Sequence, residues 1–348
     1  MRDYENAKSQ FEKVLMLDHT HREVNQYLAN TLLEFSEHEK AMHYYFRQLE
    51  KNPYFETYYN LGVLLMMKER LREALLYFDR ATLLEPNDIA TLLNRGNIYL
   101  KQNELPLAME CYEKANQLKP NDAEITHILS ALKQDSVANK APDDFISHLF
   151  DQYAPYYDVH LTDRLEYDVP KKMLSVIQCE TPHFSEQKNK IVDIGCGTGL
   201  CGAIFKPFAK NLIGIDLSEQ MLALAREKSL YDELIQEDIE VALEKFSGVD
   251  LIVSGDVFAY IGELETTFKN AFNALVDHGL FIFTVEKTYE PTFILQPSIR
   301  YAHSKNYLES LIQRTGFELL RLDNLQLRKQ KNAWIEGYLV LTRKRYPL

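Results

Sequence analysis

The chain has 348 residues, enough for about two domains, and is acidic, with 39 Lys and Arg against 51 Asp and Glu and a formal net charge of −12. This balance argues against a nucleic-acid partner, which needs a basic surface. No apolar run approaches the length of a membrane span, the first residues do not resemble a signal peptide, and four cysteines offer neither a disulfide framework nor a zinc spacing. The sequence therefore predicts a soluble, cytoplasmic protein without a bound metal.

The first 133 residues contain a repeat with a period of 33 to 34 residues, seen in Ala7, Ala41, Ala74 and Ala108 and in Pro53, Pro86 and Pro120. Phe55 to Asp88 and Ile89 to Asp122 resemble tetratricopeptide repeats. Ala123 to Lys133 is expected to cap the array. Residues 1–133 are thus predicted to be a tetratricopeptide (TPR) α-solenoid that binds a protein or peptide, with a passive spacer or a homodimerisation module as the alternative. The first helix would expose an apolar face that docks on a second chain or on the adjacent domain.

Residues 134–142 are polar and contain Pro142, which is typical of a linker. An aromatic and acidic segment follows, in which Tyr153 and Tyr157 are four residues apart and share one helical face. Since aromatic faces attract cations, this segment could cover a positively charged ligand. Ordinary packing of the helix on a sheet is the alternative.

Three later strand candidates each end on an acid: the apolar runs that close on Asp193 and Asp216, and a short strand, Glu233 to Asp238. Asp193 is followed by glycines at 195, 197 and 199, so a strand, a glycine loop and a helix are expected there. The glycines alone also fit a dinucleotide-binding loop. A carboxylate at that strand end would be repelled by a pyrophosphate, however, and favours a cationic, amino-acid-bearing ligand.

These motifs resemble those of the class I S-adenosylmethionine-dependent methyltransferases. The resemblance implies S-adenosylmethionine as cofactor, with Asp216 on the ribose, Leu217 and Met221 beside the adenine, and Asp238 on the adenine amino group. The implied cofactor site comprises Tyr153, Asp193, Gly195, Gly197, Gly199, Asp216, Leu217, Met221, Asp238, Ile239 and Asp256. With the N-terminal repeats and the Arg-Tyr-Ala-His-Ser run at 300–304, the chain resembles a bacterial group described as methyltransferases that contain such repeats. Ile299 stands where a glycine is expected.

The remaining motifs bear on the methyl acceptor. The run Ser254-Gly-Asp-Val257 lacks the Asn/Asp-Pro-Pro-Tyr/Phe loop of enzymes that methylate amide or adenine nitrogens. Residues 289–304 contain two prolines and are expected to be irregular. Within them, Arg300 could hold an anionic acceptor and His303 could remove its proton. With Tyr157, these two residues form the predicted catalytic set.

Two alternating runs, 316–327 and 334–343, are joined by residues 328–332, which are too few for a helical crossover, so an antiparallel pair is expected. Such a reversed final pair is typical of the class I methyltransferases, and the resemblance implies that residues 143–348 form a Rossmann-like, mostly parallel seven-stranded sheet with an antiparallel last strand. The predicted function is O- or N-methylation of a small molecule. The alternatives are a protein methyltransferase that recruits its substrate through the repeats and a scaffold with a silent methyltransferase fold.

Overall fold

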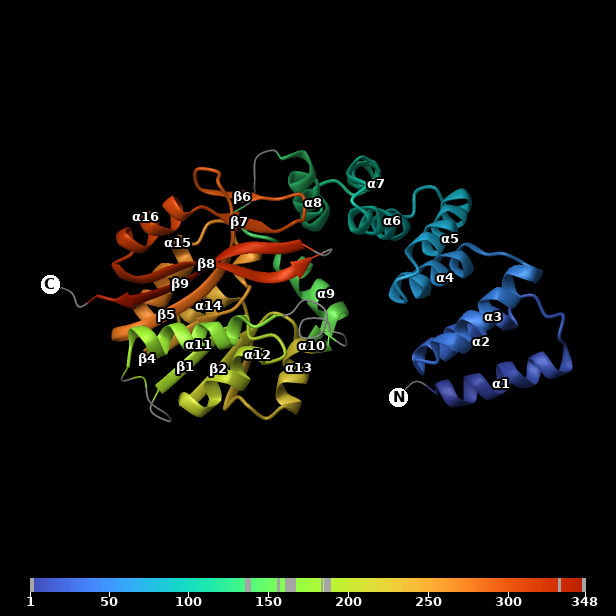
Figure 1. The fold of residues 1–348 in the computed structure, drawn as a ribbon. Helices are drawn as coiled ribbons and strands as arrows, with labels where there is room; N and C mark the ends of the chain where they lie inside the picture. Colours follow the sequence, from blue (N-terminus) through green and yellow to red (C-terminus); the bar gives the residue numbers. More distant parts are fainter. Residues whose placement is uncertain are drawn as a thin grey trace. The chain divides into compact units, whose positions relative to one another are not determined.

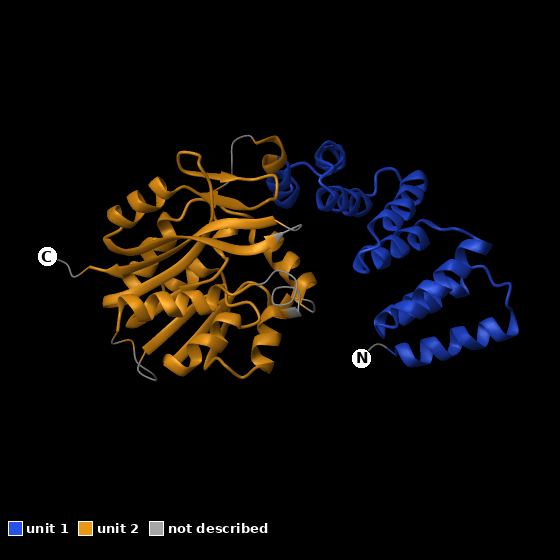
Figure 2. Ribbon diagram, in the orientation of Figure 1, with its two compact units in different colours: residues 1–129 blue, residues 130–348 orange. Residues whose placement is uncertain are grey.

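The computed structural model describes residues 3–134, 139–154, 157–159, 167–182, 184, 189–330 and 333–345. The chain divides into two compact units, Met1–Leu129 and Ser130–Leu348 (Figure 2). The first unit is helical, and the second holds a mixed sheet with helices on its faces (Figure 1). No helix among the described residues is long and apolar enough to cross a membrane. Within the same residues, no group of three or more His, Cys, Asp or Glu side chains could hold a metal ion.

The first unit is built from helical hairpins, α2 with α3, α4 with α5 and α6 with α7. Its elements are α1 (Tyr4–Leu17), α2 (Val24–Glu34), α3 (His38–Lys51), α4 (Phe55–Met67), α5 (Leu71–Leu84), α6 (Ile89–Gln102) and α7 (Leu105–Leu118), and α8 (Ala123–Lys133) runs into the second unit. A Cβ at Gly62 would lie 2.6 Å from the ring of Phe78, so the glycine allows α4 and α5 to cross closely. This packing agrees with the predicted helical repeats.

Helix α1 has a partner inside the first unit. The ring of Phe11 stacks on Tyr27 of α2 with centroids 5.6 Å apart, and Lys8 pairs with Glu37 at 2.7 Å. The premise that the first helix lacks an apolar partner is therefore wrong, because α1 packs against the first helix of the next repeat.

The second unit has the strand order β3-β2-β1-β4-β5, all parallel, followed by β9 antiparallel to β5 and β8 antiparallel to β9. The strands are β1 (Asn189–Ile194), β2 (Ala209–Asp216), β3 (Glu233–Gln236), β4 (Val249–Ser254), β5 (Leu275–Lys287), β8 (Phe317–Gln330) and β9 (Ala333–Lys344). This confirms the Rossmann-like fold class with an antiparallel strand beside β5. These seven strands match the predicted number, and two further short strands make the sheet nine-stranded. Strand β8 extends through Arg328, which the sequence analysis placed in the joining loop.

The insert after β5 is more regular than predicted. Its residues form a short hairpin of β6 (Phe293–Leu295) and β7 (Tyr301–His303), and β7 continues the sheet parallel to the end of β5. Pro291 and Pro297 lie outside both strands, so neither removes a donor from the ladder. The prolines limit the strand lengths without preventing the hairpin.

Two apolar clusters fill the two faces of this sheet. Helices α14 (Ile239–Leu243), α15 (Glu265–Ala274) and α16 (Lys305–Arg314) contribute to one cluster, and α11 (Val169–Glu180) and α12 (Leu200–Phe205) to the other. The remaining elements of this unit are α9 (Asp143–Tyr153), α10 (Tyr157–Val159), α13 (Glu219–Glu227) and the 3-10 turns Lys206–Phe208 and Phe258–Tyr260. The carboxyl ends of the parallel strands are left open to a ligand.

Candidate functional site

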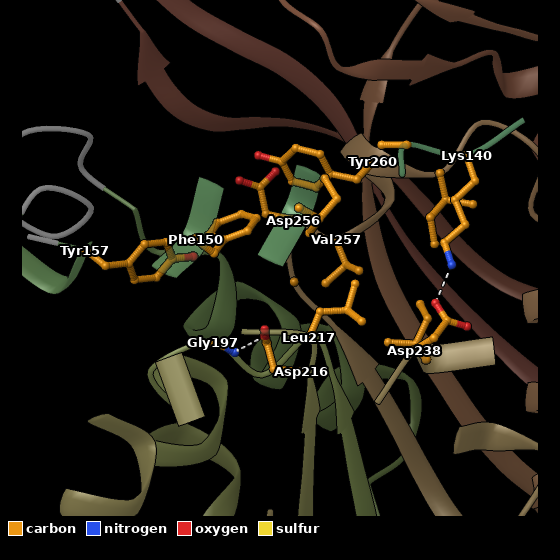
Figure 3. A pocket seen from close by; sticks show the side chains of 16 residues that line it. Lys140, Phe150, Tyr157, Gly197, Asp216, Leu217, Asp238, Asp256, Val257 and Tyr260 are labelled. Atoms are coloured by element: carbon orange, nitrogen blue, oxygen red, sulfur yellow. Dashed lines mark hydrogen bonds and ion pairs between the residues drawn. The ribbon is translucent and has the colours of Figure 1, made fainter. Parts of the chain in front are cut away.

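A pocket lies at the carboxyl ends of the parallel strands (Figure 3). Its wall is formed by Lys140, Ala141, Ile146, Phe150, Tyr157, Gly195, Gly197, Asp216, Leu217, Asp238, Ile239, Gly255, Asp256, Val257, Tyr260 and Ile261. These residues come from the loops after β1 to β4, from α9 and α10, and from the segment before α9. Open α/β sheets hold ligands at this edge.

The glycine loop after β1 is packed against its neighbours. Gly195 has φ +66°, and a Cβ there would lie 2.3 Å from Val257, so both its conformation and its surroundings require glycine. Asp193 lies beneath the loop, 1% exposed, and accepts a hydrogen bond from the Tyr231 hydroxyl at 2.6 Å. Burial raises the pKa of Asp193 to about 7, and the Tyr231 hydrogen bond opposes this. Its Oδ1 has no hydrogen-bond partner among the described residues.

Asp216, at the end of β2, is fixed by main-chain groups. Its Oδ2 accepts the N–H of Gly197 at 2.8 Å and its Oδ1 accepts the N–H of Ser218 at 2.9 Å, so the two loops are tied together. Burial raises the pKa of Asp216. The remaining lone pairs of this carboxylate can accept hydrogen bonds from a ligand's hydroxyl groups.

Asp238 caps α14 and meets a lysine that sequence reasoning did not select. Its Oδ1 accepts the N–H groups of Glu240 and Val241 at 3.0 and 3.2 Å, and its Oδ2 is ion-paired with Lys140 (Figure 3). The main chain around Lys140 bonds to the loop after β4, with the Ala141 N–H donating to the Tyr260 carbonyl at 2.9 Å. Part of the segment predicted to be a linker therefore lies in the pocket wall.

Aromatic rings form the opposite side of the pocket. Phe150 meets Tyr260 edge to face at 5.4 Å between centroids, and Tyr157 meets Tyr153 in the same way at 5.2 Å. Tyr157 and Tyr260 line the cavity, whereas Tyr153 is not among the lining residues. Three ring faces or edges near one cavity are suited to a cation.

A cluster of charged side chains adjoins the aromatic side. Arg328 of β8 is 3% exposed and donates to both oxygens of Asp256 and to Glu286 of β5. Arg300 lies over the Tyr260 ring, 5.7 Å from its centroid, and contacts Glu286 at 3.5 Å, the limit of a hydrogen bond. Ile299, just before Arg300, has φ +64°, so the backbone does adopt a conformation that favours glycine. Sequence reasoning missed Glu286 and Arg328, because no local motif marks either.

His303 lies away from the pocket lining. Its ring is fully buried, its Nε2 is 2.9 Å from the Gly262 carbonyl, and it stacks on Tyr307 with centroids 5.9 Å apart. Burial lowers its pKa to about 4. A ring in this position packs the insert hairpin against the sheet, and no feature of its surroundings supports the predicted base role.

The pocket thus brings together only part of the predicted set. Its lining includes Tyr157, Gly195, Gly197, Asp216, Leu217, Asp238, Ile239 and Asp256, and does not include Tyr153, Asp193, Gly199, Met221, Arg300 or His303. Met221 is fully buried behind the wall. The role of each residue toward a ligand stays a prediction.

Known proteins are similar to both parts of the chain. Residues 192–283 match a family model described as a methyltransferase domain, and residues 55–88 and 89–122 match two tetratricopeptide repeat models. A putative methyltransferase of Geobacillus sp. (strain WCH70) is 30% identical over 158 residues, covering 43% of this chain and 62% of the relative. A malonyl-[acyl-carrier protein] O-methyltransferase of Ilyobacter polytropus is 28% identical over 187 residues, covering 50% of this chain and 64% of the relative. The chain therefore spans less than two thirds of either relative's length.

Among solved structures, the chain is similar to the 1,6-didemethyltoxoflavin-N1-methyltransferase of Burkholderia thailandensis. The match covers 61% of this chain and 94% of that enzyme's chain, with 15% sequence identity and a TM-score of 0.46. The family models and the sheet topology together confirm the resemblance seen in the sequence. Residues 192–283 belong to a methyltransferase domain with the class I fold, and residues 55–88 and 89–122 are tetratricopeptide repeats.

Proposed function

We propose that the chain is an S-adenosylmethionine-dependent methyltransferase that acts on an oxygen or nitrogen atom of a small molecule. One observation carries this proposal: the ends of β1, β2 and β3 bring the glycine loop, Asp216 and Asp238 to the wall of one pocket. The methyltransferase family model, which covers all three strand ends, supports it.

The chemistry of the pocket residues fits this cofactor. Asp216 offers acceptor oxygens for the two ribose hydroxyls, and Asp238 offers one for the adenine amino group. Leu217 and Ile239 supply apolar surface for the adenine. The unpartnered Oδ1 of Asp193, under the glycine loop, is an acceptor for the amino group of the methionine part.

When bound, S-adenosylmethionine supplies a methyl group on a positively charged sulfur, which is already a good leaving group. The protein's task is then mostly positioning. Phe150, Tyr157 and Tyr260 exclude water from the aromatic side of the pocket and stabilise positive charge there. The ring of Tyr153, outside the pocket lining, packs edge to face against Tyr157.

The acceptor binds beyond Tyr260, beside Arg300, which lies over the Tyr260 ring. Its contact with Glu286 is 3.5 Å and its side chain is 27% exposed, so it can turn toward an anionic group of the acceptor. A carboxylate or phosphate held there would orient a small molecule against the pocket.

A second candidate acceptor comes from the relative named as a malonyl-[acyl-carrier protein] O-methyltransferase. By that similarity, the acceptor would be a carboxylate carried on a protein. The tetratricopeptide repeats would then recruit the carrier. For a small-molecule acceptor, we propose that the repeats instead serve assembly with another protein.

Thermal unfolding with S-adenosylhomocysteine, S-adenosylmethionine and NAD tests the cofactor. A ligand at one hundred times its dissociation constant stabilises by about 2.7 kcal/mol, or roughly 5–10 °C in a domain of this size. Both sulfur cofactors should raise the unfolding midpoint of the wild type and fail to raise that of Asp216→Ala. Asp232→Ala is the matched control, because Asp232 also accepts a main-chain N–H, from Leu212 at 2.7 Å, but lies outside the pocket lining. A midpoint raised by NAD alone would refute the proposal.

A further inference from the structure

Arg328 contacts Asp256 of the pocket wall because of an irregularity in the last hairpin. The ladder between β8 and β9 pairs Gln326 with Glu336 and then Arg328 with Ile335, so Leu327 is an extra residue. In an unbroken antiparallel ladder Arg328 would face Trp334, and its side chain would point to the other side of the sheet. The bulge at Leu327 therefore turns Arg328 toward the face on which Ile335 and Gly337 lie.

Gly337 lies on this face between the two neighbouring strands. It pairs with Glu286 of β5 on one side and with Leu325 of β8 on the other. A Cβ on Gly337 would lie 2.5 Å from the side chain of Leu327. The Leu327 side chain therefore occupies the space above Gly337, and Arg328, the next residue, extends across β9 to Glu286.

The same guanidinium holds Asp256 in the pocket wall. Asp256 has φ +65°, which is uncommon for a residue other than glycine, and its N–H donates to Thr284 Oγ1 at 2.9 Å. Arg328 contacts both carboxylate oxygens, at 2.6 Å for Oδ2. A strained backbone position fixed from two sides is a common feature of functional sites.

The groups around Asp256 set its charge. It faces Arg328 of β8, Glu286 of β5, Arg300 before β7, Tyr260 after β4, Tyr157 of α10 and Tyr167 before α11. Burial raises the pKa of Asp256 to about 6, and the charge of Arg300 opposes this. The direct contact with Arg328 stabilises the ionised form further, so Asp256 is a carboxylate at neutral pH and can take up a proton.

We propose that Asp256 is the proton acceptor of the methyl transfer and that Arg328 is the residue that positions it. The inference rests on the proposed function. The acceptor oxygen or nitrogen forms a bond to the methyl carbon, the carbon–sulfur bond breaks with its electron pair remaining on sulfur, and the acceptor's proton passes to Asp256 and then to solvent.

This assignment narrows the acceptor class. A carboxylate that is already ionised has no proton to give and would be repelled by Asp256. The acceptor is therefore a small molecule with a hydroxyl, phenol or N–H group at the site of methylation and a separate anionic group for Arg300. The carrier-bound carboxylate is disfavoured.

The first experiment needs no acceptor. Infrared difference spectra of wild type minus Asp256→Asn, recorded across the acid and neutral range with saturating S-adenosylhomocysteine, isolate the carboxyl band of Asp256. We expect a midpoint at or below about pH 6. In Arg328→Met the midpoint should rise by about one pH unit or more, since a neighbouring opposite charge lowers an acid's pKa by about 1–3 units. Arg343→Met is the control, because Arg343 pairs with Glu318 on the same hairpin, outside the pocket lining.

If Arg328→Met does not fold, Arg328→Lys replaces it. Lysine keeps the positive charge but cannot contact Asp256 and Glu286 through two separate nitrogens. The midpoint should then shift in the same direction by a smaller amount. An unchanged midpoint in the Arg328 variants would overturn the positioning role. Failure of S-adenosylhomocysteine to bind the wild type would instead refute the proposed function.

The second experiment measures S-adenosylhomocysteine release with two sets of probes: hydroxybenzoates and aminobenzoates against benzoate and malonate. Two results together would support the assignment. Only the first set is methylated, and the pH below which the rate falls is higher in Arg328→Met than in the wild type. Conversion of benzoate or malonate to a methyl ester would overturn it.

Discussion

Tyr231 donates a hydrogen bond to Asp193 across 2.6 Å beneath the glycine loop. Its ring also occupies the space next to three glycines, since a Cβ on Gly199, Gly202 or Gly214 would lie 3.0 Å or less from it. Tyr231 therefore links the packing of the loop to the protonation of the acid under it.

Replacing Tyr231 with phenylalanine keeps the ring and removes the hydroxyl. The hydrogen bond lowers the pKa of Asp193 from a value raised by burial, so its loss should raise that pKa above about 7 and leave more of the acid protonated at neutral pH. We expect S-adenosylhomocysteine to bind about tenfold more weakly at pH 7, as is typical for a lost hydrogen bond to a charged group, and the affinity to recover as the pH rises.

Isothermal titration calorimetry across neutral pH measures this change. Tyr27→Phe is a matched control, because Tyr27 donates a similar bond to Glu23 at 2.9 Å in the first unit. An affinity equal to that of the wild type at every pH would mean that Tyr231 acts by packing alone. An affinity equally weak at every pH would mean that its hydroxyl does not act through the charge of Asp193.

Asp193→Asn should separate stability from binding. The folded-state pKa of about 7 lies above the ordinary value of 3.8, so the folded state binds more protons and the wild type loses stability as the pH rises through this window. Asparagine does not titrate. Urea unfolding should show a stability advantage of the variant that grows from about pH 4 to about pH 7, by about 4 kcal/mol at most, while calorimetry shows loss of S-adenosylhomocysteine binding. A constant difference between the two curves would contradict a buried, titrating Asp193.

Sequence patterns located the three strand-end acids because Asp193 and Asp216 follow apolar runs, and because Asp238 follows a short strand and caps the next helix. Tyr231, Lys140 and Arg328 leave none. Each reaches its partner from a distant segment: Tyr231 across 38 positions, Lys140 across 98 and Arg328 across 72. Such contacts depend on the register and bulges of the sheet, which the alternation of apolar residues does not reveal.

The insert hairpin was missed for a related reason. Strands of three residues, Phe293–Leu295 and Tyr301–His303, are too short to produce an alternating pattern. They form because the end of β5 offers a free edge to β7. The same pairing buries His303. The sequence shows only that a histidine lies near a possible site and does not show that its side chain is buried.

Lys140→Met tests whether the segment before α9 belongs to the cofactor site. Lys140 neutralises Asp238 and can donate to a ring nitrogen of the adenine beside its amino group, so its loss should weaken S-adenosylhomocysteine binding about tenfold. Lys245→Met is the control, since Lys245 pairs with Glu237 on the surface next to Asp238. Tighter binding in Lys140→Met would show that the lysine competes with the cofactor for Asp238, and unchanged binding would show that it does not contribute to the cofactor site.

His303→Gln should change acid stability without changing the cofactor site. Burial holds the folded-state pKa of His303 at about 4, below the ordinary 6.5, so the unfolded chain takes up the proton first and the wild type loses stability as the pH falls from about 6.5 to about 4. This loss amounts to about 3 kcal/mol at most. Urea unfolding of the variant should show a weaker decline of the free energy of unfolding over that window.

His278→Asn serves as the control, because His278 is exposed and has φ +64°, which asparagine tolerates. Affinity for S-adenosylhomocysteine should match the wild type in both variants, because His303 does not line the pocket. If affinity falls in His303→Gln and the acid stability does not change, His303 acts on the ligand after all and the packing role assigned to it is wrong.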